Sequence, residues 1–190
     1  MLHPRSLALV LLFASAATLT GCTAAPTPEP TVTGAPPVST TTATPSPSAS
    51  ADGIPVTITC DELVSPQTMY DYNPNFGLVD NYVPAAGSKA AEIVALKGLA
   101  CRWVNQSSNE TIDVSVANLP HDHLESLANA LVESSNAVPT YGVEGYFETN
   151  GPIGEANAFS DPFWIVASST TFSEPGDAQP IVEAAIAGLH

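Results

Sequence analysis

The chain has 190 residues, of which 19 are acidic and only four are lysine or arginine, so its formal net charge at pH 7 is −15. A chain this acidic repels nucleic-acid phosphates and anionic lipid headgroups, which argues against both as partners. Its charges are spread along the sequence rather than clustered, a pattern that favours solubility over a charged binding stripe.

The first 22 residues have the layout of a secretory signal. A short segment with one positive charge, Arg5, precedes an apolar stretch over residues 6–19, and the small residues Thr20 and Gly21 lead to Cys22. The apolar stretch is too short for a comfortable transmembrane helix. We therefore expect residues 1–21 to direct export.

The end of this segment, Leu19-Thr20-Gly21-Cys22, resembles the lipobox of bacterial lipoproteins. In that family the cysteine sulfur receives a diacylglyceryl group, and cleavage occurs just before the cysteine. The resemblance implies that residues 1–21 are a lipoprotein signal peptide and that Cys22 is the lipidated first residue, since two or more acyl chains hold a protein stably on a membrane. An ordinary cleaved signal and an uncleaved anchor are the alternatives.

The next segment, residues 23–52, consists mainly of threonine, proline, serine and alanine and contains almost no large side chain. Such residues cannot build a core, so we expect a disordered and rather extended linker. Thirty residues of this kind span about 30 Å as a coil and roughly 90 Å as a polyproline-like rod. The linker would lift the following domain away from the membrane; a terminus without a role is the alternative.

Residues 53–190 are expected to form a single extracytoplasmic domain. In its first half, apolar alternation and capping residues predict a strand at 54–59, a helical turn at 60–64, a helix at 65–72, a break at 73–77 and a helix between Ser88 and Gly98. Clean alternation on both sides of a short turn then predicts a hairpin of strands at 99–106 and 111–119.

In the second half, a helix is predicted from Asp122 to about Ser135, because Asp122 and Glu125 have capping-box spacing before an apolar stripe. Strands at 143–149, 154–159 and 163–172 follow, and a last helix at 177–189. The strand that begins at Phe163 is apolar on both faces at first, so we place it centrally in the sheet. The local hairpins predict an α+β fold: a mostly antiparallel sheet of about five strands packed by three to four helices.

The three cysteines fall into two groups: Cys22 in the lipobox-like segment, and Cys60 and Cys101 in the domain. If Cys22 carries lipid, Cys60 and Cys101 remain as a pair in an exported chain, where oxidising conditions favour a disulfide bond. Two free buried thiols or a metal site are the alternatives. Two cysteines without companion ligands at zinc spacing are weak evidence for a metal.

Several of these features occur together in one known group of proteins. The group pattern comprises Cys60-Asp61-Glu62-Leu63, the triplet Cys101-Arg102-Trp103, a valine-rich strand, an amphipathic helix and Trp164-Ile165-Val166, all behind a lipobox and a Thr/Pro linker. It resembles small uncharacterised cell-envelope lipoproteins of Gram-positive actinobacteria, a two-cysteine type with a domain of unknown function. Some relatives look similar to extracellular sensor domains of envelope kinases. The resemblance supports the Cys60–Cys101 bridge and implies no catalytic residue.

Motifs that carry chemistry are scarce in this sequence. The cluster His121-Asp122-His123 could suggest a metal, but side chains two positions apart on a helix point about 200° apart, so we predict exposed histidines and no metal ligand. There is no Gly-x-Ser-x-Gly elbow, His-Glu-x-x-His, Cys-x-x-Cys or glycine-rich phosphate loop. We therefore predict neither a catalytic residue nor a cofactor.

Aromatic side chains gather around the loop at 73–87. Tyr70, Tyr72, Phe76 and Tyr82 either line a recognition groove or cover the edge of the core. The second interpretation describes such aromatics more often.

Two functions are consistent with the sequence. We predict a lipoprotein on the outer face of the cell membrane, with a non-catalytic domain in the cell-wall space that senses or binds an envelope protein or a small ligand. The alternative is a cell-wall-facing hydrolase with a carboxylate pair. Two acids that converge in a cleft, one with a raised pKa, favour the enzyme, whereas a pocket without such a pair favours binding.

Overall fold

The computed structural model describes residues 53–190; the expected signal peptide, Cys22 and the linker lie outside the described residues. Five α-helices are found in this part of the chain: α1 (Cys60–Leu63), α2 (Pro66–Tyr72), α3 (Lys89–Ala95), α4 (His121–Val132) and α5 (Pro175–Gly188). Seven strands accompany them: β1 (Phe76–Leu78), β2 (Leu99–Asn105), β3 (Thr111–Asn118), β4 (Asn136–Ala137), β5 (Glu144–Asn150), β6 (Ile153–Ser160) and β7 (Phe163–Ser169).

The seven strands form one antiparallel sheet with the order β1-β2-β3-β7-β6-β5-β4. Consecutive strands pair with each other, with α3 inserted between β1 and β2, except that β3 pairs with β7 at the centre although α4, β4, β5 and β6 separate them in the chain. The predicted α+β class and the predicted central place of the strand at Phe163 are confirmed. The sheet has seven strands rather than about five, because β1 and β4 contain only three and two residues, too few to show alternation.

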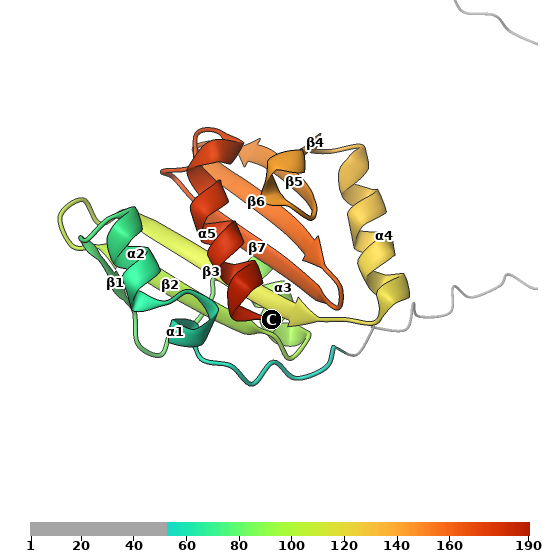
Figure 1. Cartoon of the computed structure of the whole chain (residues 1–190), viewed down its shortest axis with the longest axis horizontal. Helices are drawn as coiled ribbons and strands as arrows, with labels where there is room; N and C mark the ends of the chain where they lie inside the picture. Colours follow the sequence, from blue (N-terminus) through green and yellow to red (C-terminus); the bar gives the residue numbers. More distant parts are fainter. Residues whose placement is uncertain (1–52) are drawn as a thin grey trace, which may run out of the picture. The chain divides into compact units, whose positions relative to one another are not determined.

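One face of the sheet, which we call the α5 face, is covered by α5 together with α1 and α2 (Figure 1). Its core combines alternate residues of the central strands with the buried side of α5. Fully buried members include Val114, Ile165, Ile181 and Val182. Each large aliphatic side chain of this kind contributes roughly 1.5–3 kcal/mol by leaving water.

The opposite face, the α3 face, is covered only in part. Figure 1 shows α3 behind the sheet and α4 beside β5. A smaller core lies here, in which Ile93 of α3 and Leu124 of α4 join Trp164, Phe159 and other residues of the strands. Beyond this core the face carries polar side chains such as Asp113, Ser168 and Glu155, together with the apolar Ile153.

Two predicted elements differ from the structure. Ile54 makes an isolated antiparallel bridge to Asn118, but the rest of 54–59 joins no strand, so the predicted first strand is wrong. Helix α4 begins at His121, with Pro120 as its N-cap residue and no side-chain cap bond, and the Asp122 carboxylate accepts a hydrogen bond from the backbone N–H of His123 at 3.0 Å. The Pro120 carbonyl accepts hydrogen bonds from the backbone N–H groups of residues 123 and 124, so the N-cap lies two residues before the Asp122 that the capping-box spacing indicates.

The predicted starts of α2 and α3 are confirmed, whereas α5 begins at Pro175, two residues before the predicted Asp177. Ser65 caps α2 with Pro66 at the first helical position, and Ser88 caps α3 by accepting a hydrogen bond from the backbone N–H of Ala91 at 3.2 Å. At α1, Thr59 and Glu62 form a capping box, which explains how a helix of four residues persists.

The predicted disulfide is present. Cys60 and Cys101 are bonded, with their Cα atoms 5.7 Å apart, and the bridge joins α1 to β2 on the α5 face. Cys101 is fully buried. The bond closes a loop of 41 residues that contains α2, β1 and α3.

As for membrane contact, none of the helices within residues 53–190 is both long enough and apolar enough to cross a bilayer.

Reduction of the disulfide should lower the free energy of unfolding by roughly 4 kcal/mol, because opening a loop of this length restores entropy to the unfolded chain. Urea denaturation followed by tryptophan fluorescence, with and without dithiothreitol, measures the change. A Cys60→Ala/Cys101→Ala variant serves as the control and should respond no further to dithiothreitol. Equal midpoints for oxidised and reduced wild type would contradict the expectation.

Candidate functional site

The candidate site is a cavity of about 590 Å³ on the uncovered part of the α3 face. We call it the sheet groove. Its floor contains Arg102, Asp113, Ser115, Ser168, Glu155 and Glu148 from five strands, and Lys89 and Glu92 of α3 form one wall. Cavities of this size hold small molecules in many proteins.

The strand register aligns the charged floor residues in one row. Arg102 of β2 lies opposite Asp113 of β3, and Asp113 lies opposite Ser168 of β7. Ser168 in turn lies opposite Glu155 of β6, which lies opposite Glu148 of β5. Because side chains alternate between the two faces of a strand, all five project toward the α3 face. The row thus runs from a cation at β2 to two acids at β6 and β5.

At the β2 end the charges neutralise each other. The Arg102 guanidinium donates two hydrogen bonds to the Asp113 carboxylate, at 2.5 and 2.6 Å. The Tyr82 hydroxyl donates to the same carboxylate at 3.0 Å, and its ring lies 4.3 Å from the guanidinium carbon. Burial, together with the charge of Asp113, raises the pKa of Tyr82 to about 12. This cluster attaches the loop after β1 to the sheet.

At the other end, the core fixes the position of Glu155. The indole N–H of Trp164 donates to Asn157 Oδ1 at 3.0 Å, and Asn157 Nδ2 donates to Glu155 Oε1 at 3.1 Å. An indole nitrogen can only donate, so Asn157 must present its oxygen to Trp164 and its nitrogen to Glu155. Asn157 is fully buried. The orientation of the Glu155 carboxylate is therefore determined by packing beneath the groove.

Glu155 and Glu148 are direct cross-strand neighbours of like charge. Burial raises the pKa of Glu155, and the charges of Glu148 and Glu92 raise it further, while the Asn157 hydrogen bond and Lys89 lower it. Lys89 itself pairs with Glu92 at 3.4 Å and lies 5.4 Å from the centre of the Trp164 ring. Within the described part of the chain, neither Glu148 nor Glu155 forms a salt bridge.

Ser115 is the residue of the floor that lies next to this row toward the core. It is only 1% exposed, and it lines the groove. In the strand register it lies opposite Ala100 of β2 and Val166 of β7.

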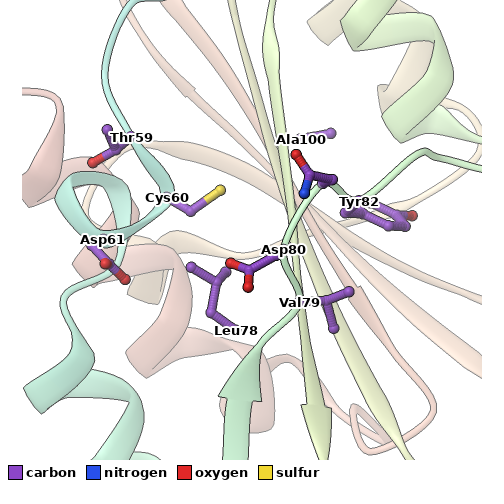
Figure 2. A pocket seen from close by; sticks show the side chains of 9 residues that line it. Thr59, Cys60, Asp61, Leu78, Val79, Asp80, Tyr82 and Ala100 are labelled. Carbon is purple, nitrogen blue, oxygen red and sulfur yellow. The ribbon is translucent and has the colours of Figure 1, made fainter.

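A second cavity, of about 310 Å³, lies at the sheet edge near the disulfide. Figure 2 shows Thr59, Cys60 and Asp61 on one side of it and the segment from Leu78 to Tyr82 on the other. Asp61 and Asp80 are its only charged lining residues. Nowhere in residues 53–190 do three or more histidine, cysteine, aspartate or glutamate side chains gather as they would around a metal ion.

The histidine cluster lies away from both cavities. His121 is exposed, and its two ring nitrogens contact Glu125 at 3.3 Å and Asp161 at 3.6 Å. His123 is half-buried, and its Nδ1 has no partner within the described chain. His121 is exposed as predicted, whereas the prediction that His123 is exposed is wrong, because its ring lies half-buried on α4.

The aromatic residues of the sequence prediction separate in the structure. Phe76 is buried in the core of the α5 face, where the Tyr72 ring packs 6.2 Å from it. Tyr70 is 62% exposed, and Tyr82 lies on Arg102. They cover the core edge and the sheet rather than line one shared groove. Sequence reasoning missed the charged row, whose signal is the set of polar residues that alternates with the apolar ones along each strand.

Comparison of the chain with protein-family models, with curated proteins and with solved structures found no match. The resemblance to small actinobacterial lipoproteins stays a prediction.

Glu155→Gln should raise the stability of the domain at pH 7. Folding raises the pKa of Glu155, so the folded state binds more protons than the unfolded state between the ordinary and the raised pKa, and stability falls as pH rises through that interval. Because glutamine does not titrate, the substitution removes this pH-dependent loss of stability. Urea midpoints should be higher for the variant at pH 7 and equal to wild type at a pH below about 4, where the carboxyl is protonated in both states.

Glu62→Gln is the matched control, and it should change the stability of the domain in the opposite direction. Hydrogen bonds from the Thr59 backbone N–H and hydroxyl lower the pKa of Glu62. This variant should be less stable than wild type at neutral pH, and the difference should shrink in acid. A Glu155→Gln variant that behaves like Glu62→Gln would contradict the assigned environment of Glu155.

Proposed function

We propose that the chain is an extracytoplasmic lipoprotein, anchored through Cys22 to the outer face of the cell membrane, whose domain binds a ligand in the sheet groove without catalysing a reaction. The groove is the site of a sensing or envelope-interaction role. Its partner is a small molecule or an exposed group of an envelope component.

The anchor is supported by the N-terminal sequence. A charged residue, an apolar stretch and a small-residue segment precede Cys22 in the order of an export signal. The disulfide between Cys60 and Cys101 is compatible with an oxidising compartment outside the cytoplasm.

The observation that carries the binding proposal is the aligned polar row in a cavity of about 590 Å³. A sheet face that only needed solubility could carry any polar residues. Here Glu155 is held in one orientation from below by Asn157, and Arg102 is held by Asp113 and Tyr82. Such fixed polar groups lower the entropy cost of binding, because they need no ordering when the ligand arrives.

A cell-wall-facing hydrolase is the second candidate, because the groove contains two neighbouring acids, Glu148 and Glu155, and the pKa of one is raised. Paired catalytic carboxylates of glycoside hydrolases flank the scissile bond. Glu148 and Glu155 project side by side from adjacent strands, so they approach a ligand from the same side. This geometry favours recognition over bond cleavage.

The anchor is tested by mass spectrometry of the protein purified from its native membrane. Cys22 should be the first residue, and it should carry a diacylglyceryl group. The Cys22→Ser variant is the control, and it should lack the modification and leave the membrane fraction. An unmodified Cys22 in the membrane-derived protein would contradict the proposed lipid anchor.

The groove is tested by photo-crosslinking in cells that produce the full chain. A photoreactive amino acid replaces Ile153, which lines the groove and is 42% exposed, or Tyr70, which lies on α2 and is 62% exposed. We expect adducts at position 153 that are missing at position 70. The same adducts at both positions, or none at 153, would contradict the proposal.

A blocking variant makes this test specific. Ser168→Tyr fills the middle of the groove with a residue that suits an exposed strand face, so the domain should still fold. It should abolish the adducts at position 153. Ser126→Tyr, on an exposed position of α4, is the matched control and should leave them unchanged.

A further inference from the structure

We propose that the cavity beside the disulfide binds a short extended peptide that carries lysine or arginine, as an added strand on the edge of β2. This cavity shares no lining residue with the sheet groove, so it is a second interaction surface that goes beyond the proposed function. The inference follows from an uncovered stretch of sheet edge, from the space in front of it and from the charges at its sides.

Strand β1 covers only part of the outer edge of β2. It pairs with residues 103–105, and the last backbone hydrogen bond between the two segments runs from the Val79 N–H to the Arg102 carbonyl at 2.8 Å. After Val79 the chain leaves the sheet. Within residues 53–190, no strand pairs with residues 99–101 on this side of β2, and we call this stretch the open edge.

The backbone groups that face outward from the open edge are those of Ala100. In an antiparallel ladder, the N–H and C=O groups of successive residues point to opposite neighbours. The Arg102 carbonyl points toward β1, whereas the Asn105 N–H points the other way and donates to the Glu110 carbonyl at 2.8 Å. Both groups of Ala100, two residues before Arg102, therefore point toward the β1 side.

Ala100 thus offers one donor and one acceptor to an incoming strand. None of the backbone hydrogen bonds that join the loops and turns of residues 53–190 involves either group. Such unpaired groups at a sheet edge are the template on which an extended peptide adds a strand. In an antiparallel pair, the central residue of the peptide exchanges two hydrogen bonds with Ala100.

Space for a peptide lies in front of these groups. The cavity of about 310 Å³ is lined by Ala100, by the start of α1 and by the segment that leaves the sheet. The open edge is bounded at one end by the bond from Val79 to Arg102 and at the other by the bond from the Val56 N–H to the Lys97 carbonyl at 3.1 Å. A strand advances about 3.3 Å per residue, so about three peptide residues fit between these contacts.

The charges beside the open edge favour a cationic peptide. Asp61 and Asp80 are the only charged residues that line this cavity, and both are exposed. Neither carboxylate forms a salt bridge with any of residues 53–190. The net charge of −15 on the whole chain acts in the same direction, because it attracts cationic partners and repels anionic ones.

Strand geometry determines where the side chains of the peptide lie. Ala100 alternates with Cys101, which is buried on the α5 face, so Ala100 and the peptide residue opposite it point to the α3 face. The two neighbours of that peptide residue point to the α5 face. Figure 2 shows the Asp80 side chain turned toward Cys60 and Asp61, which belong to α1 on the α5 face. A peptide with lysine on both sides of its central residue therefore places its charges beside the two acids.

The experiment is an NMR titration of the isotope-labelled full-length protein in a neutral detergent, with acetyl-Lys-Val-Lys-amide as the probe. The backbone amide signal of Ala100 should shift saturably, and its hydrogen exchange with water should slow, because the N–H gains a partner. Ala156 lies on β6, four places along the sheet from β1, and its amide signal should stay in place as an internal control. A titration without any change at Ala100 would contradict the inference.

Two altered peptides distinguish strand addition from simple charge attraction on the wild-type protein. Methylation of the valine nitrogen removes the donor for the Ala100 carbonyl, and acetyl-Glu-Val-Glu-amide reverses the charge. Each change should weaken binding about tenfold or more. Equal binding of the methylated peptide means that the backbone is not recognised, and the inference then fails.

Protein variants test the two acids. Asp61→Asn/Asp80→Asn should lower the affinity for acetyl-Lys-Val-Lys-amide several-fold, and both positions are exposed, so the domain should still fold. Glu133→Gln is the matched control, because Glu133 is exposed after α4 and lines neither cavity; it should bind as wild type does. An unchanged affinity of the double variant would overturn the assigned charge preference.

Other occupants give different signals. A second copy of the chain at the open edge would protect the Ala100 amide without peptide, to a degree that rises with protein concentration, and this would overturn the inference. Peptide-induced shifts at Glu148 and Glu155 without a shift at Ala100 would place the peptide in the sheet groove and would also overturn it. Crosslinking at position 153 tests the sheet groove separately, so either proposal can fail while the other stands.

Discussion

The domain depends on the pairing of β3 with β7. These strands bring together the half of the domain that precedes α4 and the half that follows it, with seven aligned residue pairs from Ile112–Ser169 to Asn118–Phe163. Neither half has a complete core alone. The core of the α5 face combines residues of β2 and β3, which lie near the disulfide, with residues of β6, β7 and α5. The same pairing places Asp113 beside Ser168 and so joins the two ends of the charged row.

The groove exists because the helices on the α3 face are too few and too short to cover it. α3 has seven residues and contacts β2 and β3, while α4 contacts β5. Trp164 and Phe159 lie beneath this cover, whereas the next rows of the sheet carry Ser115, Asn157 and then the charged residues. A single sheet face therefore changes from core to site within a few residues, and the buried amide of Asn157 joins the two regions.

Much of this architecture was predictable from local patterns. Alternation identified the hairpin of β2 and β3, serine caps identified α2 and α3, and an apolar first half placed β7 at the centre. Capping-box spacing misplaced the start of α4, because the carbonyl of Pro120 receives the first helical hydrogen bonds without a side-chain cap. The site was less predictable. Arg102, Asp113, Glu155 and Glu148 are far apart in sequence, and only the register of five strands, including the long-range β3–β7 pairing, brings them into one row.

The shortness of the outer strands affects how copies of the domain can associate through the edges of the sheet. Unpaired backbone groups at a sheet edge are templates on which a second molecule can add a strand, and long flat edges lead to aggregation. Here one edge is β4, with two residues, and the other is β1, with three. Two edge strands this short offer little backbone on which neighbouring copies could build a continuous intermolecular sheet.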